Sequence, residues 1–187
     1  NVPVKEYQIF SNMSSITLLP HICKICQKRL KYTYRKRAKH AKHMILRPAE
    51  LKDTKEVLNI VNEIHLDIPH FVWNDEEFLA KQIQNKEYFV IEHNGFLVGA
   101  MSLRERNNKV TIETLAVKKE FRLQGYGEKF IEFAKQFTKD KGFSILHVYS
   151  FSEYHAINFY LKKGFKLMDF SGYYKNHKYD CLELRLA

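Results

Sequence analysis

The segment FRLQGYGEKF, residues 121–130, holds two of the chain's seven glycines one residue apart, directly before a stretch with helical spacing. Backbone N–H groups at a helix start lack intrahelical partners, and the helix dipole adds positive potential there. Glycine permits positive φ and removes the Cβ atoms that would keep a phosphate away from the backbone. The turn is too short for a P-loop and lacks the third glycine of the dinucleotide fingerprint. We therefore expect N–H groups from about Leu123 to Glu128 to wrap a pyrophosphate, the alternative being a connection of no chemical importance.

Four possible metal ligands lie near the N-terminus, namely Cys23, Cys26, His40 and His43. Two thiolates and two imidazoles can complete a tetrahedral zinc site, although the two-residue interval between the histidines is shorter than the usual three to five. The alternative is unpaired thiols and surface histidines in a basic tail. The third cysteine, Cys181, is distant in sequence, so the cysteines form no disulfide framework and fit a reducing compartment.

Positive charge is concentrated in the same part of the chain. Residues 1–43 carry nine of the ten net positive charges, and their bases are interleaved with Tyr32 and Tyr34. This composition suits phosphate backbones and base stacking, so nucleic-acid binding is one interpretation and a solvated basic tail is the other. We place a boundary near Met44, with a basic segment at 1–43 and a main domain at 44–187.

The composition is that of a globular domain, because 45% hydrophobic and 14% aromatic residues are enough for a real core. No stretch approaches the ~18 uninterrupted apolar residues of a membrane-spanning helix, and the N-terminus lacks the order of a secretory signal. We expect a cytoplasmic protein with no membrane association.

The elements that would position the glycine turn can be read from the hydrophobic periodicity. Residues 44–64 predict a short strand, a turn and a helix capped by Asp53 or Thr54. The buried stripe of that helix comprises Val57, Leu58, Ile60, Val61 and Ile64. A second helix is predicted after Asn74. Several acidic residues follow Asn74, and acidic side chains are favourable in the first turn of a helix.

Strand periodicity begins near Tyr88. The Asn94-Gly95 pair and the Asn107-Asn108 pair predict turns between three consecutive antiparallel strands, the last of which runs into the glycine turn. A long helix from about residue 125 to 141, stopped by Gly142, is followed by a strand, a helix over about 153–164 and two final strands. The predicted order is β-αα-βββ-α-β-α-ββ, an α/β (α+β) fold with a mixed, mostly antiparallel sheet flanked by helices.

Two spaced motifs and this order of elements resemble the GNAT superfamily of acetyl-CoA-dependent N-acetyltransferases, over about residues 44–187. Residues 122–127 match the Arg/Gln-x-x-Gly-x-Gly/Ala turn that follows the fourth strand in that family. A second family pattern, Ala-x-x-x-Tyr-x-x-x-Gly-Phe, is matched by Ala156, Tyr160, Gly164 and Phe165. The resemblance implies the GNAT fold, with a sheet splayed after the strand IETLAV to admit acetyl-CoA.

The resemblance also implies which residues hold acetyl-CoA. The backbone of Leu115, Ala116 and Val117 would pair with the pantetheine arm like an added strand. The pyrophosphate would be cradled by Arg122 and the turn, which comprises Leu123, Gln124, Gly125, Tyr126, Gly127 and Glu128. Many relatives have a cofactor-contacting asparagine where this chain has Glu153, and we expect Asn158, elsewhere on the same helix, as a cofactor contact.

Transfer from a thioester to an amine needs a base for the ammonium, a donor for the carbonyl and an acid for the thiolate. The resemblance implies Tyr160 as the acid. Two bases stay open: Glu113, on the strand where family members often place one, and His147, near the glutamate base of the ribosomal-protein alanine N-acetyltransferase branch. A histidine suits base work near neutral pH. Each residue also has a structural alternative. Glu113 could form a surface ion pair, His147 could be a core histidine, and Tyr160 could be a core aromatic residue.

The C-terminal segment SGYYKNHKYDCLELRL also looks like the alanine N-acetyltransferase branch. This favours a protein or peptide amine as acceptor, with Tyr173 and Tyr174 lining its groove. The expected function is acetyl-CoA-dependent N-acetylation of a primary amine by direct attack. The alternatives are a nucleic-acid-binding module on a non-catalytic GNAT scaffold and a small-molecule amine acetyltransferase.

Overall fold

The computed structural model describes residues 44–64, 66–68 and 71–187 of the chain. In this part, seven strands form one sheet in the order β1-β2-β3-β4-β5-β7-β6, and four helices flank it. The order along the chain is the predicted one, which confirms the expected α+β fold. The basic segment, with its predicted zinc ligands Cys23, Cys26, His40 and His43, lies outside the described residues, so its zinc and nucleic-acid roles stay predictions.

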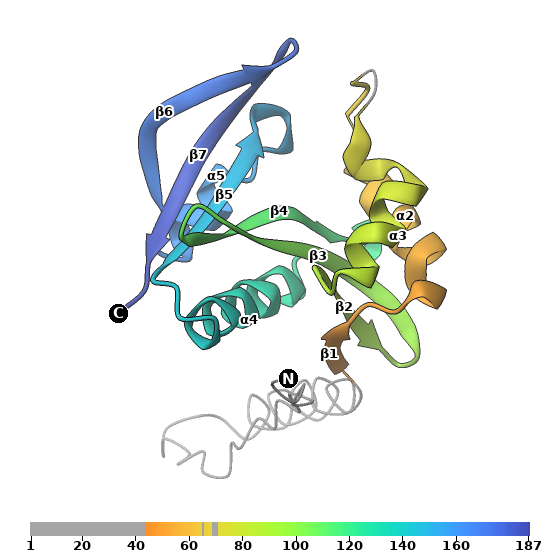
Figure 1. Cartoon of the computed structure of the whole chain (residues 1–187). Helices are drawn as coiled ribbons and strands as arrows, with labels where there is room; N and C mark the ends of the chain where they lie inside the picture. The colour runs from red at the N-terminus through yellow and green to blue at the C-terminus, as the bar shows by residue number, and fades with distance from the viewer. Residues whose placement is uncertain (1–43, 65, 69–70) are drawn as a thin grey trace, which may run out of the picture.

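Among the described residues, one pair of neighbouring strands is parallel, β4 with β5, and the other neighbouring pairs are antiparallel. The strands are β1 (Met44–Pro48), β2 (Tyr88–His93), β3 (Phe96–Arg106), β4 (Lys109–Val117), β5 (Ile145–Phe151), β6 (Lys166–Tyr174) and β7 (His177–Arg185). The helices are α2 (Thr54–Asn62), α3 (Glu76–Gln84), α4 (Tyr126–Asp140) and α5 (Ile157–Lys162). Figure 1 shows β5, β6 and β7 leading away from the plane of β1 to β4.

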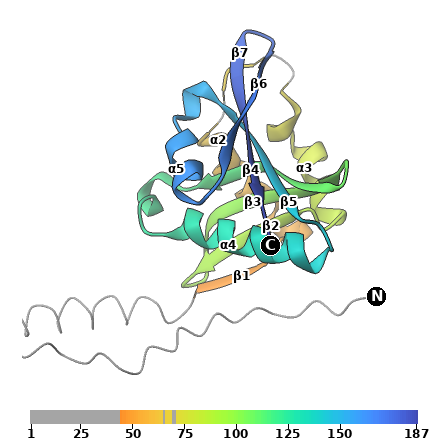
Figure 2. The ribbon, with the colours of Figure 1, turned by 90° about the vertical axis from the view of Figure 1, so that its left-hand side faces the viewer.

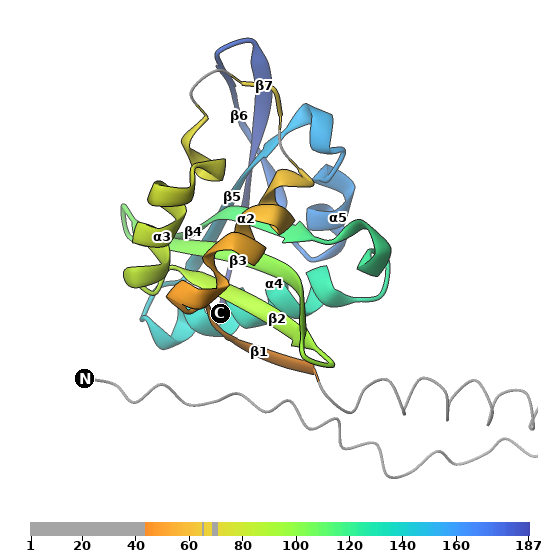
Figure 3. The same cartoon turned by 90° about the vertical axis from the view of Figure 1, so that its right-hand side faces the viewer.

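Helices cover both faces of the sheet. Figure 2 shows α4 and α5 on one side, and Figure 3 shows α2 and α3 on the other. Each face has its own buried cluster, the first built around Phe130 and Ile131 of α4 and the second around Val57, Ile60 and Leu79. The predicted stripe of α2 is confirmed, since its members are buried or half-buried against the second cluster. None of the described helices has the length and apolar character needed to cross a membrane.

The predicted turns hold β2, β3 and β4 together as consecutive strands. Asn94 and Gly95 have φ of 53° and 83°, and Asn107 and Asn108 have φ of 48° and 59°. Asparagine and glycine are the residues that adopt this left-handed conformation at low cost, and it matches the twist of a tight hairpin. The meander therefore delivers β4 directly to the glycine turn.

Helix starts differ in detail from the prediction. Asp53 precedes α2, but its carboxylate accepts hydrogen bonds from the Glu50 N–H at 2.8 Å and from Arg47 Nη1 at 2.7 Å instead of capping the helix. The N-cap of α3 is Asp75, one residue after Asn74. The Asp75 carboxylate accepts a hydrogen bond from the Phe78 N–H at 2.8 Å. The predicted helix at 153–164 is shortened to α5, because His155 adopts φ of 49° and breaks it.

A bulge at Glu113 opens the sheet. Ser102 pairs with Thr114 and Leu103 with Ile112, so Glu113 has no partner on β3. One inserted residue reverses the alternation of side chains, and a bulge also bends its strand. Parallel pairing of β4 with β5 ends at the same point, since only residues 110–112 pair with residues 146–148. The predicted splay thus begins inside IETLAV and not after its end.

Candidate active site

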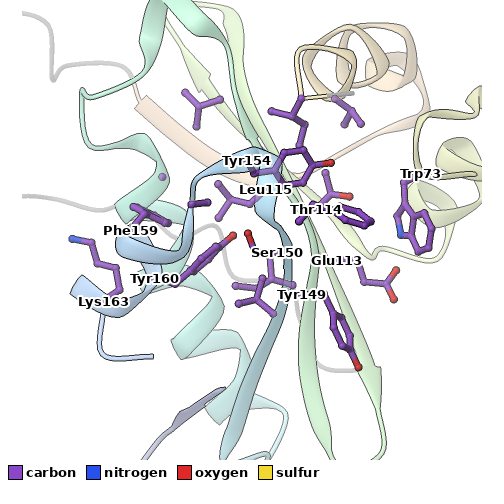
Figure 4. A pocket seen from close by; sticks show the side chains of 18 of the residues that line it. Trp73, Glu113, Thr114, Leu115, Tyr149, Ser150, Tyr154, Phe159, Tyr160 and Lys163 are labelled. Carbon is purple, nitrogen blue, oxygen red and sulfur yellow. The ribbon is translucent and has the colours of Figure 1, made fainter. Parts of the chain in front are cut away.

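A cavity of about 800 Å³ opens where β4 and β5 separate. Its walls come from β4, the glycine turn, β5, α5 and the loop before α3. Figure 4 shows Phe159, Tyr160 and Lys163 on one side of this cavity and Trp73 and Glu113 on the other. We call the first side, which includes the glycine turn, the turn end. The other is the aromatic end, lined by Phe71, Trp73, Tyr149, Phe151, Tyr174 and Tyr179.

The glycine turn leaves six consecutive N–H groups available. From Leu123 to Glu128 none donates to a backbone carbonyl of the described residues, and the first such bond of α4 runs from the Lys129 N–H to Gly125 O at 3.1 Å. Gly125 has φ of 90° at the helix start, where other residues would be strained. Free donors at a helix N-terminus bind anions, so this turn fits the pyrophosphate of acetyl-CoA.

A side chain at Gly127 would narrow the cavity floor, because its Cβ would lie 3.3 Å from Phe159 Cζ. Glu128, in the next position, forms an ion pair with Lys163, which directly follows α5, so the turn is joined to the end of that helix. Lys162 also lines the cavity. The turn end therefore carries cations beside its free N–H groups, as anion binding requires.

Arg122 lines the cavity, but its guanidinium points back to the sheet. Its Nε donates to the carbonyl oxygen of Val117 at 2.9 Å, and its Nη2 lies 3.4 Å from Glu63 Oε2. The predicted contact from Arg122 to the pyrophosphate is thus replaced, in this structure, by contacts that fix the turn. Gln124 also lies outside the cavity lining, with its Nε2 donating to Glu120 O at 2.9 Å.

The predicted strand edge borders the cavity. Leu115 and Val117 line it, whereas the side chain of Ala116 is buried on the opposite face of the sheet, where it packs in the second cluster. β4 has no strand partner on this side beyond Ile112, so its outward backbone groups face the cavity. Such an unpaired edge can take an extended ligand as an added strand.

Tyr160 of α5 lines the cavity at the turn end (Figure 4). It is 6% exposed, and burial raises the pKa of its phenol above the ordinary value. The rings of Phe159 and Phe165 lie 5.1 and 5.4 Å from its own and fix its position. Tyr160 is therefore protonated at neutral pH and can donate into the cavity. Asn158, by contrast, is exposed and lies outside the cavity lining, so the predicted contact from this position is unsupported.

Glu113, the bulged residue, lines the aromatic end with a side chain that is 6% exposed. Arg104 Nη1 lies 3.2 Å from Oε2, and Arg106 Nη2 lies 3.4 Å from Oε1. Two guanidinium groups therefore hold the carboxylate in a fixed orientation. Arg106 is itself part of the cavity wall.

His147 does not line the cavity. It is 4% exposed and lies against Tyr149, with 4.4 Å between ring centroids. Burial, with a contribution from Lys109, lowers the pKa of its imidazole to about 4. His147 is thus a neutral core side chain whose access to the cavity is covered by Tyr149.

The aromatic end draws its rings from segments far apart in sequence. Trp73 lies 5.1 Å from Phe71 and 6.1 Å from Tyr174 between ring centroids, and Phe71 lies 6.1 Å from Phe151. Of the two predicted groove tyrosines, Tyr174 lines the cavity, whereas Tyr173 is 71% exposed and does not. An acceptor with apolar surface fits this end.

Several lining residues escaped the sequence analysis, including Trp73, Arg106, Tyr149, Ser150, Tyr154, Phe159 and Lys163. Only Ser150 had a usable signal, since it is a small polar residue at the inward spacing set by Leu146 and Val148 in a buried strand. The others depend on long-range packing. Among the described residues, no group of three or more His, Cys, Asp or Glu side chains is placed to hold a metal ion.

The comparisons with known proteins agree with this geometry. The model of the acetyltransferase (GNAT) family matches residues 58–165, more than half of the chain. No curated protein matches the chain significantly.

Solved structures share the fold at low sequence identity. The PaiA N-acetyltransferase of Thermoplasma acidophilum in complex with coenzyme A is 18% identical with a TM-score of 0.66, covering 76% of this chain and 99% of its own. The ribosomal-protein-alanine N-acetyltransferase of Brucella melitensis is 16% identical with a TM-score of 0.64 and covers 76% and 99%. A chain of the NatC complex bound to a Gag peptide and CoA is 19% identical with a TM-score of 0.62 and covers 78% and 99%.

Proposed function

Because the chain belongs to the acetyltransferase (GNAT) family, whose members use acetyl-CoA, we propose that it acetylates a primary amine of a protein or peptide by direct transfer. One observation carries the proposal. A single cavity joins a turn with six free N–H groups to a buried, protonated tyrosine and to an aromatic end open to an acceptor.

The turn end would hold acetyl-CoA, which supplies the activated acetyl group. The N–H groups of Leu123 to Glu128 bind the pyrophosphate, and the open edge of β4 at Leu115 and Val117 takes the pantetheine arm. Arg122 holds the turn against β4, and Lys162 adds positive charge at the same end of the cavity.

Tyr160 would act as the general acid that protonates the leaving sulfur. Its raised pKa keeps the phenol protonated, and its position in the cavity wall favours this role over simple packing. Acid catalysis of this kind contributes about 10²- to 10⁴-fold in rate.

Of the two predicted bases, Glu113 would take the proton of the amine. It lines the cavity at the aromatic end, whereas His147 is covered by Tyr149. The contacts with Arg104 and Arg106 hold the carboxylate in one orientation, from which it would take the proton of an amine bound at this end.

A peptide acceptor is favoured by the character of the aromatic end. Among the described lining residues, both carboxylates are already paired, Glu113 with arginines and Glu128 with Lys163, so no free carboxylate offers a subsite for a second cationic group. The rings of Trp73 and Tyr174 offer apolar surface to a side chain beside the reacting amine. Two structures with the same fold also bear names that refer to peptide or protein acceptors.

Calorimetry with acetyl-CoA and thiol release in the presence of a peptide library test the proposal. We expect binding, turnover with a subset of peptides, and a loss of kcat of at least about 100-fold in Tyr160→Phe with unchanged acetyl-CoA affinity. Tyr173→Phe is the matched control, since that tyrosine is exposed and outside the cavity. Absence of acetyl-CoA binding, or turnover only with free polyamines, would reject the proposal.

A further inference from the structure

Ser150 of β5 has a buried hydroxyl without a partner. It is 2% exposed, and its Oγ makes no hydrogen bond with any of the described residues. Burying a hydroxyl in this way is unfavourable unless something bonds to it. Ser150 also lines the cavity, so a bound ligand can be that partner.

The position of Ser150 in the strand sets where its hydroxyl acts. It lies two residues after Val148 and shares its face of the sheet, because side chains alternate along a strand. Val148 and Tyr160 belong to the same buried cluster. Figure 4 shows Ser150 and Tyr160 in the same part of the cavity, with Leu115 on the facing wall. Ser150 and Tyr160 thus flank the space that the thioester would occupy.

We propose that Ser150 is a second catalytic residue, whose hydroxyl donates a hydrogen bond to the sulfur of coenzyme A as the thioester is cleaved. This inference rests on the proposed function. The amine nitrogen forms a bond to the acetyl carbon, the carbon–sulfur bond breaks with its electron pair on sulfur, and the proton of Tyr160 passes to sulfur. The nitrogen releases a proton to Glu113, which passes it to solvent, and the phenolate regains a proton from solvent.

The buried position of Tyr160 explains why a second donor is useful. Because burial raises the pKa of this phenol, Tyr160 is a weaker acid toward the leaving sulfur than an exposed tyrosine. Negative charge then builds on sulfur inside an apolar cavity, where a fixed donor is worth more than in water. The Ser150 hydroxyl stabilises this charge without giving up its proton.

Ser102 provides a matched control within the same sheet. Its hydroxyl is also fully buried and lacks a hydrogen-bond partner among the described residues, but it lies in β3 outside the cavity lining. Replacing either serine by alanine removes an unsatisfied hydroxyl, so both variants should fold and melt no lower than the wild type. Only Ser150→Ala should change the binding preference for the sulfur of coenzyme A and the rate of thioester cleavage.

An equilibrium experiment tests the contact without turnover. Calorimetry compares coenzyme A with desulfo-coenzyme A in the wild type, Ser150→Ala and Ser102→Ala. We expect the wild type and Ser102→Ala to prefer coenzyme A by about three- to ten-fold, the range of one hydrogen bond, and Ser150→Ala to lose at least half of that preference. An equal preference in all three proteins would overturn the inference. Failure of the wild type to bind either compound would instead reject the proposed function.

Kinetics then test whether the contact is catalytic. Ser150→Ala should lower kcat about 10- to 100-fold with little change in KM for acetyl-CoA, and Ser150→Cys, which keeps a weak donor, should recover part of it. In a Tyr160→Phe background the loss should shrink, because both groups act on one sulfur. A kcat for Ser150→Ala within two-fold of Ser102→Ala would contradict the catalytic role.

Discussion

Arg122 donates a hydrogen bond from Nε to the carbonyl oxygen of Val117, at 2.9 Å, and so joins the glycine turn to the end of β4. The same guanidinium reaches Glu63 at the end of α2, 3.4 Å away. Three elements therefore meet at one side chain, which holds the turn in place beside β4. The relative placement of the strand edge and the anion site depends on this contact.

Replacing Arg122 by alanine should weaken acetyl-CoA binding. We expect the Kd to rise about ten-fold, since both parts of the cofactor site lose a fixed relative position and a cation is removed. The free energy of unfolding should fall by less than about 1 kcal/mol, because the ion pair with Glu63 is partly solvated. Calorimetry and thermal melting measure both. Arg185→Ala, which removes an exposed ion pair with Glu183, is the control, and equal Kd values for the two variants would contradict this role.

Alanine substitutions at Gly125 and Gly142 distinguish the effect of backbone strain from an effect on ligand binding. Both have left-handed φ, 90° and 77°, and open space around a Cβ, but only Gly125 lies in the cavity. Alanine at either position should cost about 1 kcal/mol of stability, since a left-handed conformation strains a side-chain-bearing residue. Only Gly125→Ala should also raise the acetyl-CoA Kd, by several-fold, through displaced N–H groups. Parallel chemical unfolding and calorimetry distinguish the two effects, and equal affinity of both variants would argue against the anion site.

The fold could be predicted where it depends on neighbouring residues in the sequence. It could not be predicted where it depends on contacts between distant segments. The turns at Asn94-Gly95 and Asn107-Asn108 follow from residues that tolerate positive φ, so the order of β2, β3 and β4 could be predicted. The bulge at Glu113 could not, because it depends on the register between two strands and not on a residue type. The bulge in turn decides where the cavity opens.

The candidate site was predictable where backbone chemistry dominates. The free N–H groups of the glycine turn follow from its composition, whereas the direction of the Arg122 side chain depends on Glu63, 59 positions earlier in the chain. The burial of His147 under Tyr149 depends on how β5 packs. The aromatic end combines rings from residues 71–179, a proximity that no spacing in the sequence reveals.

His147 should make stability depend on pH below neutrality. Its folded pKa, about 4, lies below the ordinary value of 6.5, so the unfolded chain binds a proton that the folded chain refuses. His147 leaves the free energy of unfolding unchanged above pH 6.5 and lowers it as the pH falls toward 4, by roughly 3 kcal/mol. Urea unfolding of wild type and His147→Gln between pH 7 and 4 measures the difference. A parallel pH dependence in both proteins would show that other groups control this range.

Glu113→Gln tests the base while keeping the shape of the side chain. We expect kcat to fall about 100-fold at neutral pH, because the amide cannot accept the amine proton. Binding of acetyl-CoA should stay the same, since Glu113 lies at the aromatic end of the cavity. Glu105→Gln, which removes an exposed partner of Lys141, is the matched control. A loss below about five-fold would mean that the ion-paired carboxylate serves to hold Arg106 and not to take up a proton.

Trp73→Ala should separate acceptor binding from cofactor binding. The indole packs against Phe71 and Tyr174 at the aromatic end, so its removal deletes apolar surface that would contact the acceptor. We expect KM for the best peptide to rise about ten-fold or more, with the acetyl-CoA Kd unchanged, because contacts of an aromatic group that a bound peptide covers are worth about 1 to 3 kcal/mol. Phe96→Ala, at an exposed hairpin position outside the cavity, controls for loss of an aromatic side chain. If Trp73→Ala weakens acetyl-CoA binding and leaves the peptide KM unchanged, the two ends of the cavity have been assigned in the wrong order.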